Sequence, residues 1–325
     1  MSAQRPETLV FLDRDTTDRG DIDFSGIEAL GELVSHGTST PAETAVRLAE
    51  ADIALTNKAL IGGTEMDAAP RLKLIQVVAT GVNNIDLDAA RARDLAVCNV
   101  SGYSTEAVAQ HVFASLLNLF TNVHRFAAEP EKWAESPLFT RLDYPVGELA
   151  GKTLGIVGLG SIGRAVARIG EAFGMEVVAY GRDGASDAGA VPRLDHETFF
   201  ATADAITLHC PLTPETRHFI RHDTLALMKP DAVLINTGRG DLVEEEDLVA
   251  ALRAGTIRGA AVDVLTPEPP PADHPFLAAC AAGLDNLLIT PHTAWSAREA
   301  RQRLLDGVVA NIRAFRAGER VNRVV

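Results

Sequence analysis

Residues 151–164 read GKTLGIVGLGSIGR, and this stretch decides the fold. The apolar run 154–157 has the length and β-branched content of a strand, and apolar residues recur at helical spacing after Gly163. A strand, a glycine-rich turn and a helix, in this order, are the context that a dinucleotide-binding GxGxxG motif requires. The stretch therefore predicts a βα unit that binds a dinucleotide, and the alternative is an ordinary βα turn.

Each glycine of the motif has a mechanical role. Gly158 allows the tight turn, Gly160 lets the backbone approach a pyrophosphate, and Gly163 lets the helix pack close to the strand. The anion is then expected at the positive end of the new helix, beside the unpaired backbone N–H groups of Ser161 and Ile162. These five residues are the first predicted cofactor contacts.

Length and composition exclude several classes of protein. The chain has 325 residues, enough for two domains, and is 46% hydrophobic and 23% charged. No apolar run approaches a membrane span, and the N-terminal MSAQRPETLVFLD lacks the apolar region of a signal peptide. A net charge of −14 argues against nucleic acid and anionic membranes as partners, but local charge decides whether a substrate is anionic.

The cysteines indicate the compartment. Cys98, Cys210 and Cys280 are scattered and odd in number, which suggests neither a disulfide framework nor a zinc site. We therefore expect no bound metal. Free thiols, two of them within apolar strand-like runs, are typical of a cytoplasmic protein.

The first hundred residues alternate between strand-like and helix-like segments. Strands are predicted at 8–12, 53–56, 72–79 and 97–100, with helices at 26–34, 41–51 and 86–93. This alternation predicts a parallel sheet covered by helices. Because the region has no glycine motif, we expect it to be a domain other than the cofactor domain.

A long apolar helix is predicted at 105–120, with Ser104 or Thr105 as its N-cap. His111 lies on this helix, where a hydrogen-bonded structural histidine is favoured over a catalytic one. Residues 125–148 are irregular and contain Trp133, Phe139 and Tyr144, which favours a subunit interface over a plain surface loop.

The second half of the chain continues as a doubly wound sheet. Strands follow the first one at 176–180, 205–209, 232–236, 259–264 and 287–290, which makes six. Helices are predicted at 197–201, 224–228, 244–253 (ending at Gly255) and 297–315. The predicted fold is α/β, with two Rossmann-like or flavodoxin-like parallel-sheet domains linked by two long crossover helices. Residues 1–103 and 294–325 form the substrate-binding domain, and residues 104–293 form the dinucleotide-binding domain.

Ligands of open α/β sheets bind beyond the carboxyl ends of the strands, so the residues there are candidate site residues. Arg239, Glu268 and His292 follow three neighbouring strands. An arginine matches a substrate carboxylate and polarises a carbonyl, while a histidine supplies a proton near neutral pH. A carboxylate beside the imidazole favours its protonated form. Each residue alone has a structural explanation, but together they predict hydride transfer to a 2-oxo acid.

The chain resembles the D-isomer-specific 2-hydroxyacid dehydrogenase family across nearly its whole length. The matching motifs are TGVNNID (80–86), STEAVAQH (104–111), GLGSIG (158–163), HCPLTPET (209–216), INTGRGDLV (235–243), AAVDV (260–264) and ITPHTAW (289–295). The resemblance implies that Arg239, Glu268 and His292 are catalytic and that Asp263 contacts the nicotinamide carboxamide. It also implies a homodimer built largely through the cofactor domain.

Within the family, His292 followed by Thr-Ala-Trp295, together with Asn57, is most similar to hydroxypyruvate reductases, also called glycerate dehydrogenases. The expected substrate is hydroxypyruvate or glyoxylate, reduced to the D-2-hydroxy acid with His292 as proton donor. Another 2-oxo acid, of the D-lactate or aryl pyruvate type, is the alternative. The remaining substrate contacts are expected to be the backbone of Ala79, Thr80 and Gly81, with Trp295 closing the pocket unless it serves only in packing.

The choice between NAD and NADP depends on the end of the second strand of the cofactor domain. NAD-specific members have an acidic residue there, but this chain has Gly181 followed by Arg182. Loss of the acid removes repulsion toward a 2′-phosphate, which Arg182 can pair with, so NADP(H) is slightly favoured. In the opposing interpretation, the Asp183 carboxylate hydrogen-bonds the ribose of NAD. Further cofactor contacts are expected from Cys210, Pro211, Thr216 and Thr237.

A different class of protein with the same fold and catalytic residues is a dinucleotide-sensing corepressor, which is a binding protein. The intact catalytic residues favour an enzyme. Two other branches fit poorly: long phosphoglycerate dehydrogenases carry an additional regulatory domain, and formate dehydrogenases have glutamine at the position of Glu268.

Overall fold

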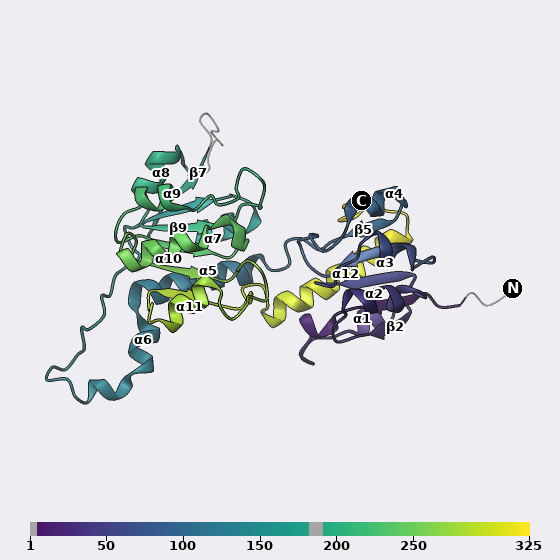
Figure 1. Ribbon diagram of the computed structural model, residues 1–325, viewed down its shortest axis with the longest axis horizontal. Helices are drawn as coiled ribbons and strands as arrows, with labels where there is room; N and C mark the ends of the chain where they lie inside the picture. Colours follow the sequence, from purple (N-terminus) through teal and green to yellow (C-terminus); the bar gives the residue numbers. More distant parts are fainter. Residues whose placement is uncertain (1–4, 182–190) are drawn as a thin grey trace. The chain divides into compact units, whose positions relative to one another are not determined.

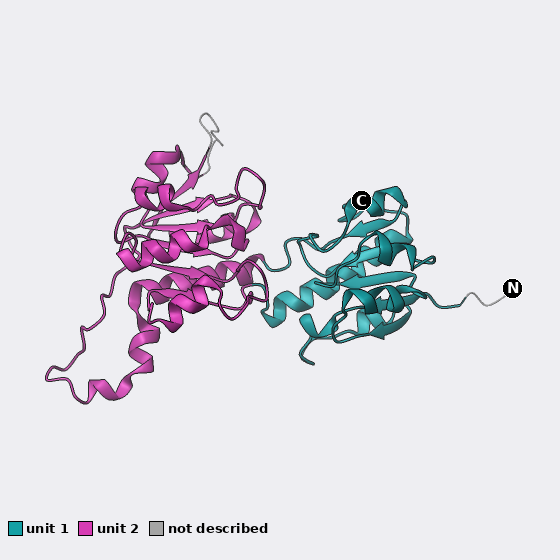
Figure 2. Ribbon diagram, in the orientation of Figure 1, with its two compact units in different colours: residues 1–104, 295–325 teal, residues 105–294 magenta. Residues whose placement is uncertain are grey.

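The computed structural model describes residues 5–181 and 191–325. The chain divides into two compact units, one comprising Met1–Ser104 and Trp295–Val325 and the other Thr105–Ala294 (Figure 2). Each division lies one residue from the boundary expected from the sequence. Two sheets, one in each unit, contain only parallel strand pairs in the described part of the chain, so the predicted α/β fold class is confirmed.

The first unit has a five-stranded sheet in the order β2-β1-β3-β4-β5. This is the flavodoxin-like order, in which the chain reverses direction across the sheet between β1 and β3. The strands are short and mostly buried on both faces, as expected for a parallel sheet covered by helices. Their bounds are β1 (Thr8–Phe11), β2 (Glu32–Ser35), β3 (Ile53–Thr56), β4 (Leu74–Val77) and β5 (Ala96–Cys98).

Helices connect these strands (Figure 1). They are α1 (Ser25–Glu28), α2 (Pro41–Leu48), α3 (Gly63–Asp67) and α4 (Leu87–Ala92), together with the 3-10 turn η1 (Arg14–Thr16). The C-terminal α12 (Arg298–Arg316) also belongs to this unit. α2 begins as its sequence predicts, because Thr40 accepts a hydrogen bond from the Glu43 N–H and Pro41 occupies the first turn. No helix within the described ranges is long and apolar enough to cross a membrane.

The prediction of a helix at 26–34 was wrong. The helix α1 ends at Glu28, and Glu32–Ser35 form the edge strand β2, which pairs with β1. Gly31 explains the change of structure, because a β-carbon there would lie 2.4 Å from the Glu7 carbonyl oxygen. The close approach of two strands therefore overrides the helical pattern at this point.

The second unit has a seven-stranded sheet in the order β12-β11-β10-β9-β6-β7-β8. Chain direction across the sheet reverses between β6 and β9, as in a doubly wound dinucleotide-binding fold. The sequence predicted six of these strands and missed the two-residue edge strand β8, so the count was wrong by one. The bounds are β6 (Thr153–Val157), β7 (Glu176–Tyr180), β8 (Arg193–Leu194), β9 (Ala205–Leu208), β10 (Val233–Asn236), β11 (Gly259–Val262) and β12 (Leu287–Ile289).

Helices cover both faces of this sheet. They are α5 (Thr105–Thr121), α6 (Val123–Ala128), α7 (Ser161–Ala172), α8 (His196–Thr202), α9 (His222–Leu227), α10 (Glu245–Ala254) and α11 (Pro275–Ala281), with 3-10 turns η2 (Pro130–Trp133) and η3 (Gly240–Leu242). α10 ends at Gly255 with φ +68°, which confirms the predicted C-cap. The sequence did not predict α3, α6 or α11.

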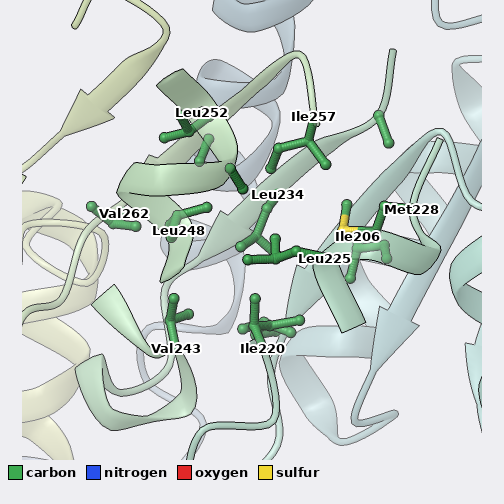
Figure 3. Packing of buried hydrophobic residues seen from close by; sticks show 14 of the residues in the cluster. Ile206, Ile220, Leu225, Met228, Leu234, Val243, Leu248, Leu252, Ile257 and Val262 are labelled. Carbon is green, nitrogen blue, oxygen red and sulfur yellow. The ribbon is translucent and has the colours of Figure 1, made fainter. Parts of the chain in front are cut away.

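Two hydrophobic clusters hold the sheet between its helices. Leu234 of β10 belongs to the cluster under α9 and α10, which includes Leu248 and Leu252 (Figure 3). Its neighbours Val233 and Ile235 belong to the cluster under α5 and α7. Successive side chains of a strand point to opposite faces, and each fully buried Leu or Ile stabilises the fold by about 1.5–3 kcal/mol. This packing fixes the strand ends that carry the candidate site residues.

Residues 123–148, called the arm below, leave the body of the second unit and return to it (Figure 1). The arm contains α6 and η2, although the sequence predicted an irregular segment at 125–148. Its apolar side chains are unusually accessible, with exposed fractions of 62% at Trp133, 91% at Phe139 and 77% at Leu142. Arg141, in contrast, is held by Glu129 and Asp143.

Candidate active site

The glycine-rich turn has the geometry that the sequence predicts. Gly158 has φ +102°, and a β-carbon there would lie 2.6 Å from the Cys210 nitrogen. At Gly163 a β-carbon would lie 2.1 Å from the Gly158 carbonyl oxygen, so only glycine allows α7 to pack this close to the turn. The roles of Gly158 in the turn and of Gly163 in packing are confirmed.

The same turn leaves space for an anion. A β-carbon built on Gly160 would meet no atom of the described residues within 4 Å, and Gly160 is the N-cap of the twelve-residue helix α7. The backbone N–H groups of Ser161 and Ile162 therefore begin a helix beside open space, which suits a pyrophosphate. At the end of β10, Thr237 Oγ1 is buried and has no hydrogen-bond partner in the described ranges, as expected for a hydroxyl that meets a ligand. These residues fit a dinucleotide.

The loop after β9 is held by its own hydrogen bonds. Thr216 Oγ1 donates to the Pro211 carbonyl oxygen at 2.7 Å and accepts from the Thr213 N–H at 2.8 Å. Cys210 and Pro211 begin this loop, directly against Gly158. The loop therefore lies across the sheet's switch point, between the ends of β6 and β9.

The structure brings Glu268 and His292 together. His292 Nδ1 lies 2.6 Å from Glu268 Oε2, a charge-assisted hydrogen-bond distance in which the nitrogen donates to the carboxylate. The second oxygen, Glu268 Oε1, accepts the Leu265 N–H at 2.9 Å. Both side chains are about one-third exposed, so the pair is accessible to a substrate while its orientation is fixed. This contact confirms that the ends of β11 and β12 meet.

Asp263 organises the backbone around His292. Its side chain is 1% exposed, and its carboxylate accepts the N–H groups of Thr293 and Ala294, both at 2.9 Å. It also accepts the Thr290 hydroxyl at 2.5 Å, while the Asp263 carbonyl oxygen accepts the His292 N–H. His292 is thereby held at φ +53°, a backbone conformation that few residues other than glycine adopt.

Arg239 follows β10 on the neighbouring strand end. Its Nη1 donates to the Gly238 carbonyl oxygen at 2.7 Å, and the residue is half-buried. Asn236 shapes this turn, because its side chain bonds both the Gly238 N–H and the Arg239 carbonyl oxygen. β10, β11 and β12 are adjacent in the sheet, so Arg239, Glu268 and His292 follow three neighbouring strands, as predicted.

His111 belongs to the same network, in a structural role. Its Nε2 lies 3.1 Å from Thr290 Oγ1 and 3.7 Å from Asp263 Oδ1. This is the hydrogen-bonded helix histidine that the sequence favoured. Sequence reasoning missed Thr290, although its place directly after β12 was a signal.

The predicted substrate residues lie in the first unit. Asn57 is 5% exposed, and its side-chain amide donates to Thr16 Oγ1 at 3.0 Å. The buried carboxylate of Asp13 accepts the N–H groups of residues 57, 58 and 59, which fixes this loop. Trp295 packs edge-on against Tyr103, with ring centroids 6.2 Å apart, so it has a packing role in addition to any role in substrate binding.

Ala79, Thr80 and Gly81 follow β4 in the first unit. Thr80 Oγ1 donates to the Val100 carbonyl oxygen at 3.0 Å, and the Thr80 carbonyl oxygen accepts from Asn99 Nδ2 at 2.7 Å. These bonds hold the 79–81 backbone in place at a strand end of its own sheet. The predicted role of this backbone in binding a carboxylate stays a prediction.

The end of β7 requires glycine. A β-carbon on Gly181 would lie 2.6 Å from Arg193 Cβ and 2.9 Å from Arg193 Cδ. An acidic side chain at this position would therefore require Arg193 to move. The predicted contacts of Arg182 and Asp183 lie outside the described residues.

Comparison with known proteins decides the family. Residues 113–294 match the model described as "D-isomer specific 2-hydroxyacid dehydrogenase, NAD binding domain", which spans most of the second unit. The chain belongs to the D-isomer specific 2-hydroxyacid dehydrogenase family. The second unit is thus the NAD-binding domain of an oxidoreductase, as the glycine turn indicates.

Relatives in this family match along nearly the whole chain. A hydroxypyruvate reductase of Blautia hydrogenotrophica is 36% identical, covering 97% of this chain and 99% of the relative. A glycerate dehydrogenase of Methylorubrum extorquens is 41% identical, covering 97% and 98%. The solved D-lactate dehydrogenase of Escherichia coli superposes with a TM-score of 0.84 at 27% identity, covering 98% of this chain and all of that one.

Proposed function

We propose that this dehydrogenase reduces hydroxypyruvate or glyoxylate to the D-2-hydroxy acid, with His292 as the proton donor. The observation that carries the proposal is the 2.6 Å contact of His292 Nδ1 with Glu268 Oε2, at strand ends of the sheet that also carries the dinucleotide turn. The curated relatives named above, a hydroxypyruvate reductase and a glycerate dehydrogenase, support the choice of substrate.

His292 holds the proton that completes the reduction. When bound, the nicotinamide supplies a hydride to the carbonyl carbon of the substrate. Because Nδ1 is occupied by Glu268, Nε2 is the imidazole nitrogen left to give its proton to the carbonyl oxygen. The Glu268 carboxylate accepts the hydrogen bond of Nδ1 and thereby fixes the ring orientation.

Arg239 binds and polarises the 2-oxo acid. A guanidinium presents paired N–H donors that match a carboxylate, and its charge stabilises the oxygen that becomes negative during hydride addition. The Asn236 contacts hold the backbone of Arg239 for this role. The backbone of residues 79–81 is also proposed to bind the substrate carboxylate, with Asn57 and Trp295 as further substrate contacts.

NADP(H) is the proposed cofactor. The side chain that could repel a 2′-phosphate is missing at Gly181, and the following Arg182 has the charge to pair with one. Arg193 contacts Gly181 in the structure and adds a second cation at this strand end. Gly158, Gly160, Gly163 and the loop from Cys210 to Thr216, with Thr237 and Asp263, complete the proposed cofactor site.

The test is a panel of 2-oxo acids with NADPH and NADH. We expect the highest kcat/KM for hydroxypyruvate or glyoxylate, with NADPH preferred. His292→Gln and Arg239→Ala should each lower kcat by at least about 10²-fold while leaving the dissociation constant of the cofactor nearly unchanged. Higher kcat/KM for another acid would overturn the substrate assignment, and no turnover with any acid would favour a dinucleotide-sensing binding protein.

The cofactor assignment has its own control. Arg182→Ala should lower kcat/KM with NADPH and leave the value with NADH nearly unchanged. An equal effect on both cofactors, or none on NADPH, would contradict the role of Arg182.

We further propose a homodimer that covers the arm. Trp133, Leu138, Phe139, Leu142 and Val146 are all at least 60% exposed, and a cluster of accessible apolar side chains is typical of an interface. The family resemblance implies a dimer through the cofactor domain, and the arm belongs to that domain. The cytoplasm is the proposed location, because all three cysteines are free thiols.

A further inference from the structure

A buried histidine–glutamate pair contacts the loop that carries Glu268. His274 Nε2 is 2.9 Å from Glu245 Oε2, and the two side chains are 1% and 13% exposed. Glu245 is the first residue of α10, and His274 is the N-cap of α11. Neither residue has a role in the hydride transfer described above. A buried ionisable pair is costly unless it is well organised, so its contacts are informative.

The hydrogen bonds of His274 define its protonation. The Phe276 N–H donates to His274 Nδ1 at 3.3 Å, so Nδ1 carries the lone pair and Nε2 carries the proton. That nitrogen lies at ion-pair distance from the Glu245 carboxylate and makes no hydrogen bond within the described residues. Burial raises the pKa of Glu245 and the nearby carboxylates of Asp241 and Glu244 raise it further, while His274 and the hydrogen bond from the Thr266 N–H lower it. His274 is thus one of two groups that oppose neutralisation of Glu245.

The other oxygen of Glu245 reaches the catalytic loop. Glu245 Oε1 accepts the Thr266 N–H at 3.1 Å, and the preceding Leu265 N–H donates to Glu268 Oε1 at 2.9 Å. Glu268 Oε2 in turn contacts His292 at 2.6 Å. A chain of contacts therefore runs from His274 through Glu245 and the backbone of 265–266 to the catalytic pair.

The same backbone also lies against the arginine turn. A β-carbon on Gly240, the residue after Arg239, would lie 2.3 Å from Thr266 Oγ1 and 2.4 Å from the Leu265 carbonyl carbon. A shift of residues 265–266 would therefore displace both Glu268 and the turn that carries Arg239.

We propose that His274 and Glu245 are positioning residues, which hold the 265–268 segment so that Glu268 meets His292 in the productive geometry. The proposal rests on the proposed function, since it assigns the pair a role in the same site. The charged and titratable groups near Glu245 are His274, Asp241 and Glu244, and Glu268 faces His292.

Two substitutions of His274 separate its two contacts. In His274→Asn the short amide oxygen can replace Nδ1 as the cap of α11, but nothing replaces Nε2 at Glu245. In His274→Gln the longer amide can reach Glu245, but the cap is lost. We expect the melting temperature to fall more in His274→Gln and kcat to fall more in His274→Asn, by about tenfold, with the KM of the cofactor unchanged in both.

A double-mutant cycle tests whether the pair acts through Glu268. Adding His274→Asn to Glu268→Gln should lower kcat no further, because the contact that His274 positions is already lost. If kcat falls in proportion to melting temperature in all variants, or if the two substitutions are additive, the pair is only structural.

A readout without turnover keeps this test separate from the choice of substrate. The Nδ1 resonance of His292, which reports its hydrogen bond to Glu268, can be followed by NMR in the isotope-labelled full chain. We expect this resonance to move in His274→Asn and to stay near its wild-type position in His274→Gln. An unchanged resonance in His274→Asn would overturn the positioning role, whereas absence of activity with the acid panel would overturn only the proposed function.

Discussion

Glu268 is the residue whose charge most directly controls His292, because their side chains are 2.6 Å apart. Glu268→Gln keeps the size of the side chain and an oxygen for the Leu265 N–H but removes the charge. A hydrogen bond to a charged group is worth about 1.5–3 kcal/mol, more than a neutral one. Loss of the charge weakens the contact that orients the His292 ring, so kcat/KM for reduction should fall by about tenfold.

The measurement is kcat/KM for reduction by both variants and the wild type at one pH. Glu246→Gln is the matched control, because Glu246 is exposed on α10 and loses the same charge. An unchanged kcat/KM in Glu268→Gln would contradict the role of this carboxylate.

His209 makes the stability of the second unit dependent on pH. Burial lowers the pKa of His209 to about 4, whereas an unfolded histidine titrates near 6.5. Between these values the unfolded chain binds a proton that the folded chain does not. The unfolding free energy therefore falls as the pH drops from about 6.5 toward 4, and the loss from this residue reaches about 2 kcal/mol at pH 5.

His209→Phe should remove this contribution. The check is urea unfolding of both proteins at pH 7 and pH 5, comparing the difference between the two pH values. His222→Phe is the control, since the His222 side chain is 83% exposed. An equal loss of stability in the wild type and His209→Phe would show that His209 is not responsible.

At the scale of elements, two glycines of the turn between β6 and α7 have different roles, one in stability and one in cofactor binding. Gly163→Ala places a methyl group 2.1 Å from a backbone oxygen and should destabilise the protein by about 1–3 kcal/mol. Gly160→Ala meets no atom of the described residues within 4 Å, so stability should change by less than about 0.5 kcal/mol. Its methyl group should instead weaken cofactor binding at least tenfold, or about 1.4 kcal/mol.

Urea melts and fluorescence titrations with NADPH distinguish the two effects. Normal cofactor affinity in Gly160→Ala would contradict a pyrophosphate close to this backbone. A fully stable Gly163→Ala would show that α7 can move away from the turn.

The helices and strands also show where the local sequence pattern is sufficient to predict an element. β3, β7 and α5 lie where alternation, apolar runs and caps predict them, because each carries its own signal over several residues. β2 and β8 do not, because these edge strands depend on a partner strand whose position the local sequence does not encode. α3 and α11 are too short for a helical period to stand out.

For the whole molecule, the arm predicts the oligomeric state. Replacing Phe139 and Leu142 by serine removes two apolar side chains that are 91% and 77% exposed. If the arm is covered by a second copy of this chain, the variant should sediment as a monomer where the wild type is a dimer. Val46→Ser is the control, because Val46 is 76% exposed on α2 of the other unit.

Analytical ultracentrifugation over a range of concentrations checks this prediction. A monomeric wild type, or a dimer that persists in the Phe139 and Leu142 double variant, would contradict an interface at the arm.

The amino-acid sequence by itself determined the α/β class, the glycine turn and the catalytic candidates. Each was recognised from a local signal: an alternation of strands and helices, a glycine motif, or a residue placed just after a strand. The position after a strand was enough to select Arg239, Glu268 and His292, since parallel strands end at a common edge. Only the tertiary structure decided which groups touch. The contacts of Asp263 with the His292 loop, and of His274 with Glu245, join residues on different elements, and such pairings arise from packing that no local pattern records.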